Sequence, residues 1–258
     1  MRRFFATLVS CLAVVAAGAE KAGKRISFVS CPIVRDTRTV PCWLAEHEGR
    51  LYYLTLQTDV SAPVTPPWLG HKVLVEGVLS EKPDICGGRV IAPVTLSVLP
   101  ELDASCNTML PADERYELGF EPPRPPGPSR GRLAFGDPVM RDAAAERQIA
   151  LRYEFDGMVV FRHAQNLQKI LDTARASKAE ELRITAYRSG SRLSDGTVMR
   201  ERESIARERA EQIRELLVGA GLEGVKYTLS WKDLSKRPDG SAADADNRRA
   251  EVEIVGGR

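Results

Sequence analysis

The C-terminal stretch that decides the fold reads LRITAYRSGSRLSDGTVMRERESIARERAEQIRELLVGAG, residues 182–221. It opens with an alternation of apolar and polar residues over Leu182–Tyr187, which predicts a half-buried strand. An amphipathic helix is expected to follow, from about Val198 to Ala220. Gly221 comes next and suits the left-handed conformation that ends many helices. A strand joined to a long helix indicates a mixed α and β domain.

Arg209 lies on the apolar face of this expected helix. At 100° per residue it falls among the apolar side chains of Ile205, Ala206, Ile213, Leu216, Leu217 and Ala220. Burying an unpaired guanidinium is costly, so Arg209 must extend to solvent, pair with an acid, or face a cavity that receives an anion. The alternating charges of 200–203 and 207–211 leave a further reading open, since such runs are typical of a solvated helix face.

The neighbouring segments complete the domain. Apolar patterns predict strands at 151–155, 225–231 and 249–254, and a helix over about 162–177. The expected order is β-α-β-α-β-β. The predicted fold of this half is therefore an α+β sandwich with helices on one face of a mixed sheet.

Two short motifs add a family resemblance over about residues 150–255. The helix carries Arg209-Ala210, and the last strand begins within the string Asn247-Arg248-Arg249-Ala250-Glu251. With the element order, these motifs resemble the periplasmic OmpA-like domain, which binds peptidoglycan non-covalently. The resemblance implies that Arg209 takes a carboxylate of diaminopimelate in the wall peptide, a task that suits the planar donor fork of arginine.

One position departs from the family pattern. Family members follow the strand with an aspartate that receives the ligand's ammonium group, whereas this chain reads Ala186-Tyr187-Arg188-Ser189. Losing that charge-assisted bond lowers affinity by about 1.5–3 kcal/mol if nothing compensates. Asp195 could replace the acid, or Arg188 could recruit a second carboxylate, while Asp195-Gly196 also reads as an ordinary turn. The candidate ligand-binding residues are Tyr187, Arg188, Ser189, Asp195 and Arg209.

The N-terminus predicts export. Arg2 and Arg3 precede an apolar run to Ala17, and Ala17-Gly18-Ala19 fits a signal-peptidase site, so residues 1–19 are expected to be a cleaved signal peptide. The alternatives are acylation at Cys11 and an uncleaved anchor, although about fourteen apolar residues are fewer than the roughly 20 that span a membrane. We expect a periplasmic, Gram-negative envelope protein, associated with the outer membrane, without a transmembrane segment after cleavage.

The cysteines predict a disulfide-bonded N-terminal domain. Four remain after signal cleavage, and all lie in the first half of the chain: Cys31, Cys42, Cys86 and Cys106. Two bridges are expected in an oxidising compartment, and four cysteines allow three pairings. The shortest loops favour Cys31–Cys42 and Cys86–Cys106. A zinc site has little support, because no CxxC occurs and the histidines, His47, His71 and His163, are far apart.

The first half reads as a small all-β domain over 24–118. Strands are expected at 51–56, 71–79 and 89–99, and their character suggests a closed, OB-like barrel. Four aromatic residues form either its core or a sugar-stacking surface: Trp43, Tyr52, Tyr53 and Trp68. The proline-rich stretch after Gly119 predicts an extended linker over 119–148, which separates this domain from the OmpA-like one at 149–258.

Composition narrows the function. The chain has 258 residues, 43% hydrophobic content and a formal charge of +2, enough for two ordinary domains and too neutral for a typical nucleic-acid binder. We expect no cofactor and no enzyme, because neither a nucleophile with its base nor clustered metal ligands are visible. Paired carboxylates for glycoside cleavage stay open. The expected partners are peptidoglycan and, through the β-domain, another envelope protein; the alternative is a scaffold that has lost the wall ligand and binds proteins.

Overall fold

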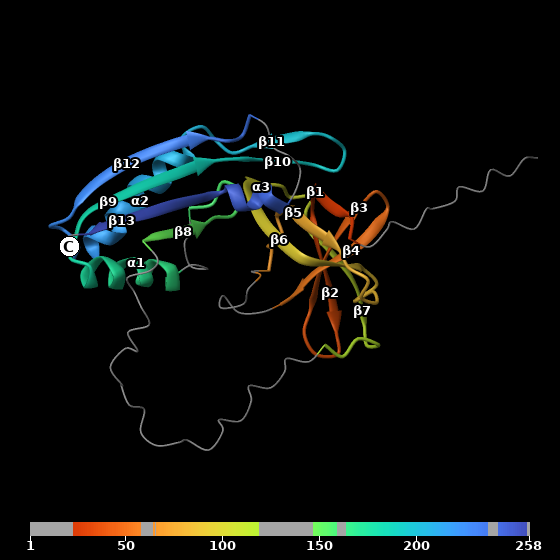
Figure 1. Ribbon diagram of the computed structural model, residues 1–258. Helices are drawn as coiled ribbons and strands as arrows, with labels where there is room; N and C mark the ends of the chain where they lie inside the picture. Colours follow the sequence, from red (N-terminus) through yellow and green to blue (C-terminus); the bar gives the residue numbers. More distant parts are fainter. Residues whose placement is uncertain are drawn as a thin grey trace, which may run out of the picture.

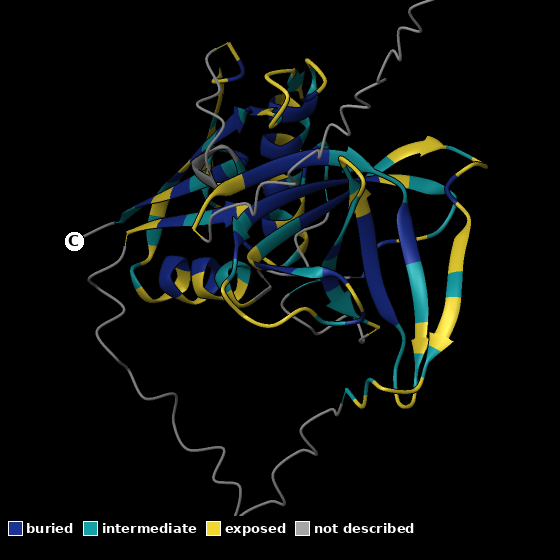
Figure 2. Cartoon of the chain, turned by 90° about the vertical axis from the view of Figure 1, so that its right-hand side faces the viewer, coloured by how far each residue is buried: buried dark blue, intermediate teal, exposed yellow. Residues whose placement is uncertain are grey.

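A computed structural model describes residues 23–57, 64, 66–118, 147–158, 164–236 and 242–256. Two domains, each built on its own sheet, lie side by side (Figure 1). Buried residues run along the strands of both (Figure 2). The expected signal peptide, Cys11 and the expected linker up to residue 146 lie outside the described residues.

Among its described residues, the N-terminal domain contains strands and no helix. Its strands are β1 (Arg25–Ser30), β2 (Pro32–Thr37), β3 (Cys42–His47), β4 (Arg50–Leu56), β5 (His71–Leu79), β6 (Arg89–Leu102) and β7 (Thr108–Asp113). They form one seven-stranded sheet in the order β1-β5-β6-β4-β3-β2-β7. The sheet curls so that the edge strand β1 meets β3: the Ser30 hydroxyl donates to the Glu46 carbonyl at 2.7 Å. The OB-like assignment stays a prediction.

The aromatic residues of this domain divide between core and surface. Tyr52 and Trp43 are buried in the apolar core, so the core interpretation is right for these two. Tyr53 is partly buried, and Trp68 is 61% exposed. The four residues therefore form no common sugar-stacking surface.

The disulfides join Cys31 to Cys106 and Cys42 to Cys86, so the pairing favoured by loop length is wrong. The reason lies in strand register. In the β2–β3 hairpin Cys42 lies opposite Arg35, several positions away from Cys31. Strand β7 instead runs parallel to β2, with Ile33 beside Thr108, and this brings Cys106 next to Cys31.

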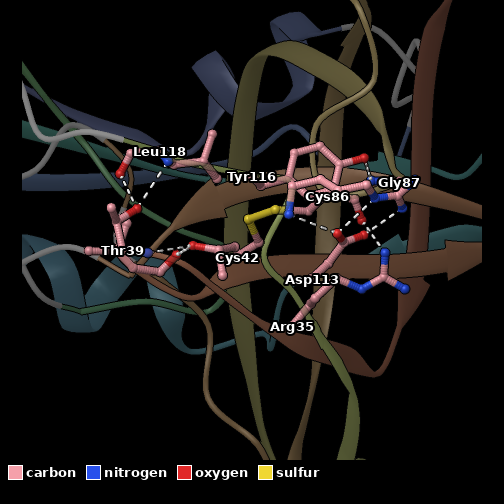
Figure 3. The surroundings of a disulfide bond; sticks show 11 residues. Arg35, Thr39, Cys42, Cys86, Gly87, Asp113, Tyr116 and Leu118 are labelled. Carbon is pink, nitrogen blue, oxygen red and sulfur yellow. Dashed lines mark hydrogen bonds and ion pairs between the residues drawn. A yellow bond between two sulfur atoms is a disulfide. The ribbon is translucent and has the colours of Figure 1, made fainter.

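The second bridge fixes the loop between β5 and β6 (Figure 3). Arg35 donates from Nη1 to the Cys86 carbonyl at 2.8 Å, and the Gly87 amide donates to the Tyr116 hydroxyl at 2.8 Å. Gly87 has a φ of +75°, a conformation that side-chain-bearing residues rarely adopt. The loop is thus held by the disulfide and by side chains of β2 and of the chain after β7.

The C-terminal domain has the predicted element order with two additions, a short hairpin before the long helix and a short helix before the last strand. Its elements are β8 (Gln148–Arg152), α1 (Ala164–Ala176), β9 (Ala179–Arg188), β10 (Gly190–Arg192), β11 (Val198–Arg200), α2 (Ile205–Gly219), β12 (Lys226–Asp233), α3 (Ala242–Asn247) and β13 (Arg249–Gly256). The main sheet has the order β12-β9-β13-β8, with β9 and β12 parallel and β13 antiparallel to its neighbours. Helices α1 and α2 pack on one face, against the buried side chains of Leu182, Ile184 and Val252.

The first addition, the β10–β11 hairpin, corrects the predicted start of the long helix. Residues from Val198 to Arg200 pair with Gly190–Arg192, and helix α2 begins only at Ile205. The turn of the hairpin contains Asp195-Gly196, where Gly196 has a φ of +88°. Gly221 takes the expected left-handed conformation after α2, with a φ of +91°.

The hairpin docks the C-terminal domain onto the N-terminal one. At its tip the Ser194 amide donates to the Ser27 carbonyl at 2.7 Å, and the Ser27 amide donates to the Ser194 hydroxyl at 2.9 Å. Nearby, Glu76 of β5 forms a buried ion pair with Arg248 and accepts a hydrogen bond from the Ser191 hydroxyl at 2.7 Å. The two domains therefore meet through buried polar contacts.

Candidate functional site

Arg209 lies on α2 and is fully buried, with 0% exposure. Nε donates to the Gly157 carbonyl at 3.0 Å, Nη1 to the Tyr187 carbonyl at 3.2 Å and Nη2 to the Glu154 carbonyl at 3.1 Å. The Nη1 and Nη2 groups also donate to the two carboxylate oxygens of Glu201, at 3.3 and 2.7 Å. A guanidinium has five N–H groups, and these contacts use all of them.

Glu201 is the acid that pairs with Arg209. It lies between β11 and α2 and is also fully buried. Its carboxylate accepts two further hydrogen bonds, from the Ser189 amide at 2.8 Å and the Asp156 amide at 3.0 Å. The fork of Arg209 and two backbone amides thus converge on one carboxylate. The arrangement is a complete carboxylate-binding site that is occupied from within the chain.

An aromatic ring and a second acid border this pair. Tyr153 places its ring 4.4 Å from the Arg209 guanidinium carbon. Burial raises the pKa of the Tyr153 phenol, and the charge of Arg209 opposes that shift. Asp156 accepts a hydrogen bond from the Arg202 amide at 2.8 Å. Burial, with a smaller contribution from Glu201, raises the pKa of the Asp156 carboxyl.

Three of the other predicted residues lie around the Glu201–Arg209 pair. Ser189 is buried and contributes its backbone amide, not its hydroxyl. Arg188 donates from Nε to the Glu201 carbonyl at 2.6 Å and pairs with Asp233 at 3.0 Å. Tyr187 contributes its carbonyl, while its hydroxyl donates to Glu251 at 2.9 Å. Among the described residues, no hydrogen bond or ion pair joins any of these three side chains to the carboxylate of Glu201.

Asp195 lies apart from this group. The hairpin pairs Gly190 with Arg200 at its base, beside Glu201, and Asp195 lies in the turn at the other end. There its Oδ1 accepts the Thr197 amide at 2.8 Å, and the side chain lines a cavity beside β1. The structure therefore does not bring Asp195 to Arg209.

Sequence reasoning missed Glu201. The residue belongs to the alternating run Arg200–Glu203, which we interpreted as part of a solvated helix face. The run lies before the helix, where the chain turns between β11 and α2. Three alternatives were left open for Arg209: extension to solvent, pairing with an acid, or facing a cavity. In the structure it pairs with an acid. An acidic residue eight positions upstream of a buried arginine was the available signal.

Neither a metal site nor a membrane helix occurs in the described part of the chain. No group of three or more potential metal ligands gathers among residues that the structure describes. In the same residues no helix has the length and hydropathy needed to cross a membrane.

Comparisons with known proteins give structural neighbours only. No protein-family model matches the chain, and no curated protein matches it. The similar solved structures include the OmpA-like domain of FopA1 from Francisella tularensis, with 11% identity, a TM-score of 0.32, and coverage of 43% of this chain and 75% of that one. The cell wall anchor of the T6SS from Pseudomonas aeruginosa has 16% identity, a TM-score of 0.34, and coverage of 43% and 81%. A protein described as MotB-like from Desulfovibrio vulgaris has 16% identity, a TM-score of 0.34, and coverage of 43% and 77%.

Proposed function

We propose that this chain is an exported, non-enzymatic protein of the cell envelope whose C-terminal domain is an interaction module with a self-occupied carboxylate site. The observation that carries this proposal is that all five N–H groups of Arg209 are donated to internal acceptors, two of them oxygens of Glu201. An incoming carboxylate would have to replace a buried one that already accepts four hydrogen bonds. The wall-peptide site implied by the family motifs is closed in this arrangement.

The docked domains support the role of an interaction module. The buried contacts of Glu76 with Arg248 and Ser191 hold one domain against the other, so both present their surfaces in a fixed relation. Large apolar side chains remain exposed on each: Trp68 is 61% and Trp231 54% exposed. Exposed tryptophans are frequent anchors in protein interfaces. The partner in this proposal is another envelope protein.

Peptidoglycan binding is the second candidate, and one observation favours it. Arg209, the Ser189 amide and the Asp156 amide converge on a single carboxylate, which is the chemistry that a wall-peptide carboxylate would need. Glu201 would then be a replaceable occupant, and its departure would free Arg209. In this case Tyr187, Arg188 and Ser189 surround the ligand, while Asp195 has no part in it.

Co-sedimentation with purified sacculi separates the two candidates. We expect the wild-type protein and the Glu201→Gln variant both to stay in the supernatant if the domain is a protein-interaction module. Retention of Glu201→Gln, but not of wild type, would favour the replaceable occupant. Retention of wild type that is lost in Arg209→Lys would overturn the proposal of a closed site. The matched control is Glu203→Gln, which changes an exposed acid two residues away, and circular dichroism checks that each variant is folded.

A further inference from the structure

We infer that a second site, at the junction of the two domains, binds a small zwitterion such as an amino acid or a short peptide with free termini. The site is a cavity of about 360 Å³ lined by Ser27, Phe28, Val29, His47, Lys72, Leu193 and Asp195. The first five of these residues belong to the N-terminal domain and the last two to the β10–β11 turn. The complete cavity therefore exists only while the domains are docked.

Asp195 supplies the negative side of the cavity. Its exposed carboxylate accepts the Thr197 amide through Oδ1, and no lysine or arginine in the described ranges forms an ion pair with it. The hydrogen bond from Thr197 lowers the pKa of Asp195, and His47 adds to the shift, so the group stays charged at neutral pH. Two hydrogen bonds hold the turn in place, from the Ser194 amide to the Ser27 carbonyl and from the Ser27 amide to the Ser194 hydroxyl. A fixed carboxylate of this kind suits a ligand ammonium group.

Lys72 supplies the positive side. Its Nζ lies 3.1 Å from Asp103 Oδ2, which positions the amine, while the side chain remains 49% exposed. An ammonium group has three donors, so hydrogen-bonding capacity remains for a ligand carboxylate. His47 stands beside it, stacked on Phe28 with ring centroids 4.4 Å apart, and its Nε2 lies 3.8 Å from Glu48.

The charges around the cavity select the ligand class. A simple anion would be repelled by Asp195 and by the acids beside the two basic groups, Asp103 and Glu48. A simple cation could pair with Asp195 but would leave the ammonium group of Lys72 without a ligand carboxylate. A molecule with one charge of each sign can satisfy both ends, and the apolar walls formed by Val29 and Leu193 can accept its side chain.

The test is a titration of the ¹⁵N-labelled full protein with glycine, dialanine and trialanine, whose charges lie progressively further apart. We expect saturable shifts confined to the amides of Val29, Leu193, Ser194 and Asp195 for at least one of them. Blocking the amine by acetylation, or the carboxylate by amidation, should weaken that ligand about tenfold or more, because each removes a charge-assisted bond. The absence of localised shifts with all three ligands would overturn the inference.

Matched variants assign the two ends of the ligand. Asp195→Asn keeps an acceptor for the Thr197 amide but removes the charge, and we expect it to weaken the unblocked ligand about tenfold while leaving the amine-acetylated form unchanged. Lys72→Gln should do the same for the carboxylate end. Asp84→Asn and Lys82→Gln remove exposed charges outside the cavity and serve as controls. Equal affinities of Asp195→Asn and Asp84→Asn for the unblocked ligand would also contradict the inferred site.

Discussion

The protein buries two arginines, Arg209 within the C-terminal domain and Arg248 between the domains. The buried charge of Arg209 is compensated more completely than that of Arg248. Both are 0% exposed, and both pair with a buried glutamate. Arg209 donates from all three nitrogens, whereas the Nε of Arg248 has no hydrogen-bond partner within the described ranges. The first pair is a finished part of a domain core. The second pair lies at the interface between the two domains.

The largest effect is expected from breaking the Arg209 pair. Arg209→Met keeps much of the side-chain volume but leaves Glu201 buried without its counter-charge. It also removes the guanidinium donor from the carbonyls of Gly157, Tyr187 and Glu154, of which the last still accepts the Gly157 amide. We expect the free energy of unfolding to fall by about 3–5 kcal/mol, as for other buried pairs that lose one member. Urea unfolding followed by circular dichroism measures the change.

Arg207→Met is the control for this variant. Arg207 lies on the same helix, with its side chain 56% exposed and an ion pair to Glu211 at 3.9 Å, so its loss should cost less than about 1 kcal/mol. Equal stabilities of the two variants would show that the buried pair of Arg209 and Glu201 does not stabilise the domain.

Glu76→Gln tests the pair at the junction and should have a smaller effect. The variant leaves Arg248 without a counter-charge, but separation of the domains would expose the guanidinium to water, so we expect a cost below the about 3–5 kcal/mol of a buried pair that cannot reach solvent. We expect the domains to unfold in two steps instead of one, measured by calorimetry. The exposed residue Glu81 provides the control variant Glu81→Gln, and a single unfolding transition in Glu76→Gln would contradict an interface that opens independently.

Ser191→Ala removes a neutral member of the same junction. The hydroxyl donates to Glu76 at 2.7 Å and lies 3.2 Å from the Ser27 hydroxyl. Because the Glu76–Arg248 pair remains, we expect a loss of only about 1–2 kcal/mol, measured as the change in urea midpoint. Ser105→Ala alters an exposed serine in the same protein and is the comparison. A loss as large as that of Glu76→Gln would mean that the serine network, and not the ion pair, holds the domains together.

The main strands and the two long helices of the C-terminal domain could be predicted where their apolar residues recur with the period of a strand or a helix. Alternation in β9 and the apolar face of α2 report directly on burial against one sheet. The hairpin β10–β11 could not be predicted from periodicity, since its strands are only three residues each. A three-residue strand has too few alternations to distinguish it from the start of a helix.

Contacts between residues far apart in the sequence also could not be predicted. Helical geometry placed Arg209 on the buried face but could not identify its acid, because Glu201 precedes the helix in a turn whose path depends on the hairpin. Glu76 and Arg248 lie 172 residues apart and meet only when the domains dock. The predicted disulfide pairing was wrong for the same reason, because strand order, not loop length, decides which cysteines meet.

The smallest effect, and the one that probes the surroundings of Arg209 most finely, comes from Tyr153→Phe. The Tyr153 hydroxyl is buried and has no hydrogen-bond partner in the described part of the chain, while its ring lies on Arg209. Removing the hydroxyl should therefore raise the free energy of unfolding at pH 7, by less than about 1 kcal/mol.

Burial raises the pKa of Tyr153 above its ordinary value of 10.0. Above pH 10 the folded protein thus keeps the phenol proton that the unfolded chain loses. The free energy of unfolding is therefore unaffected by this group below pH 10 and falls as the pH rises above that value. Between pH 9 and pH 11 the wild type should lose about 1.4 kcal/mol more than Tyr153→Phe, measured by urea unfolding at each pH. Equal losses of stability in wild type and Tyr153→Phe would mean that the Tyr153 hydroxyl reaches water, and that the surroundings of Arg209 are open to solvent.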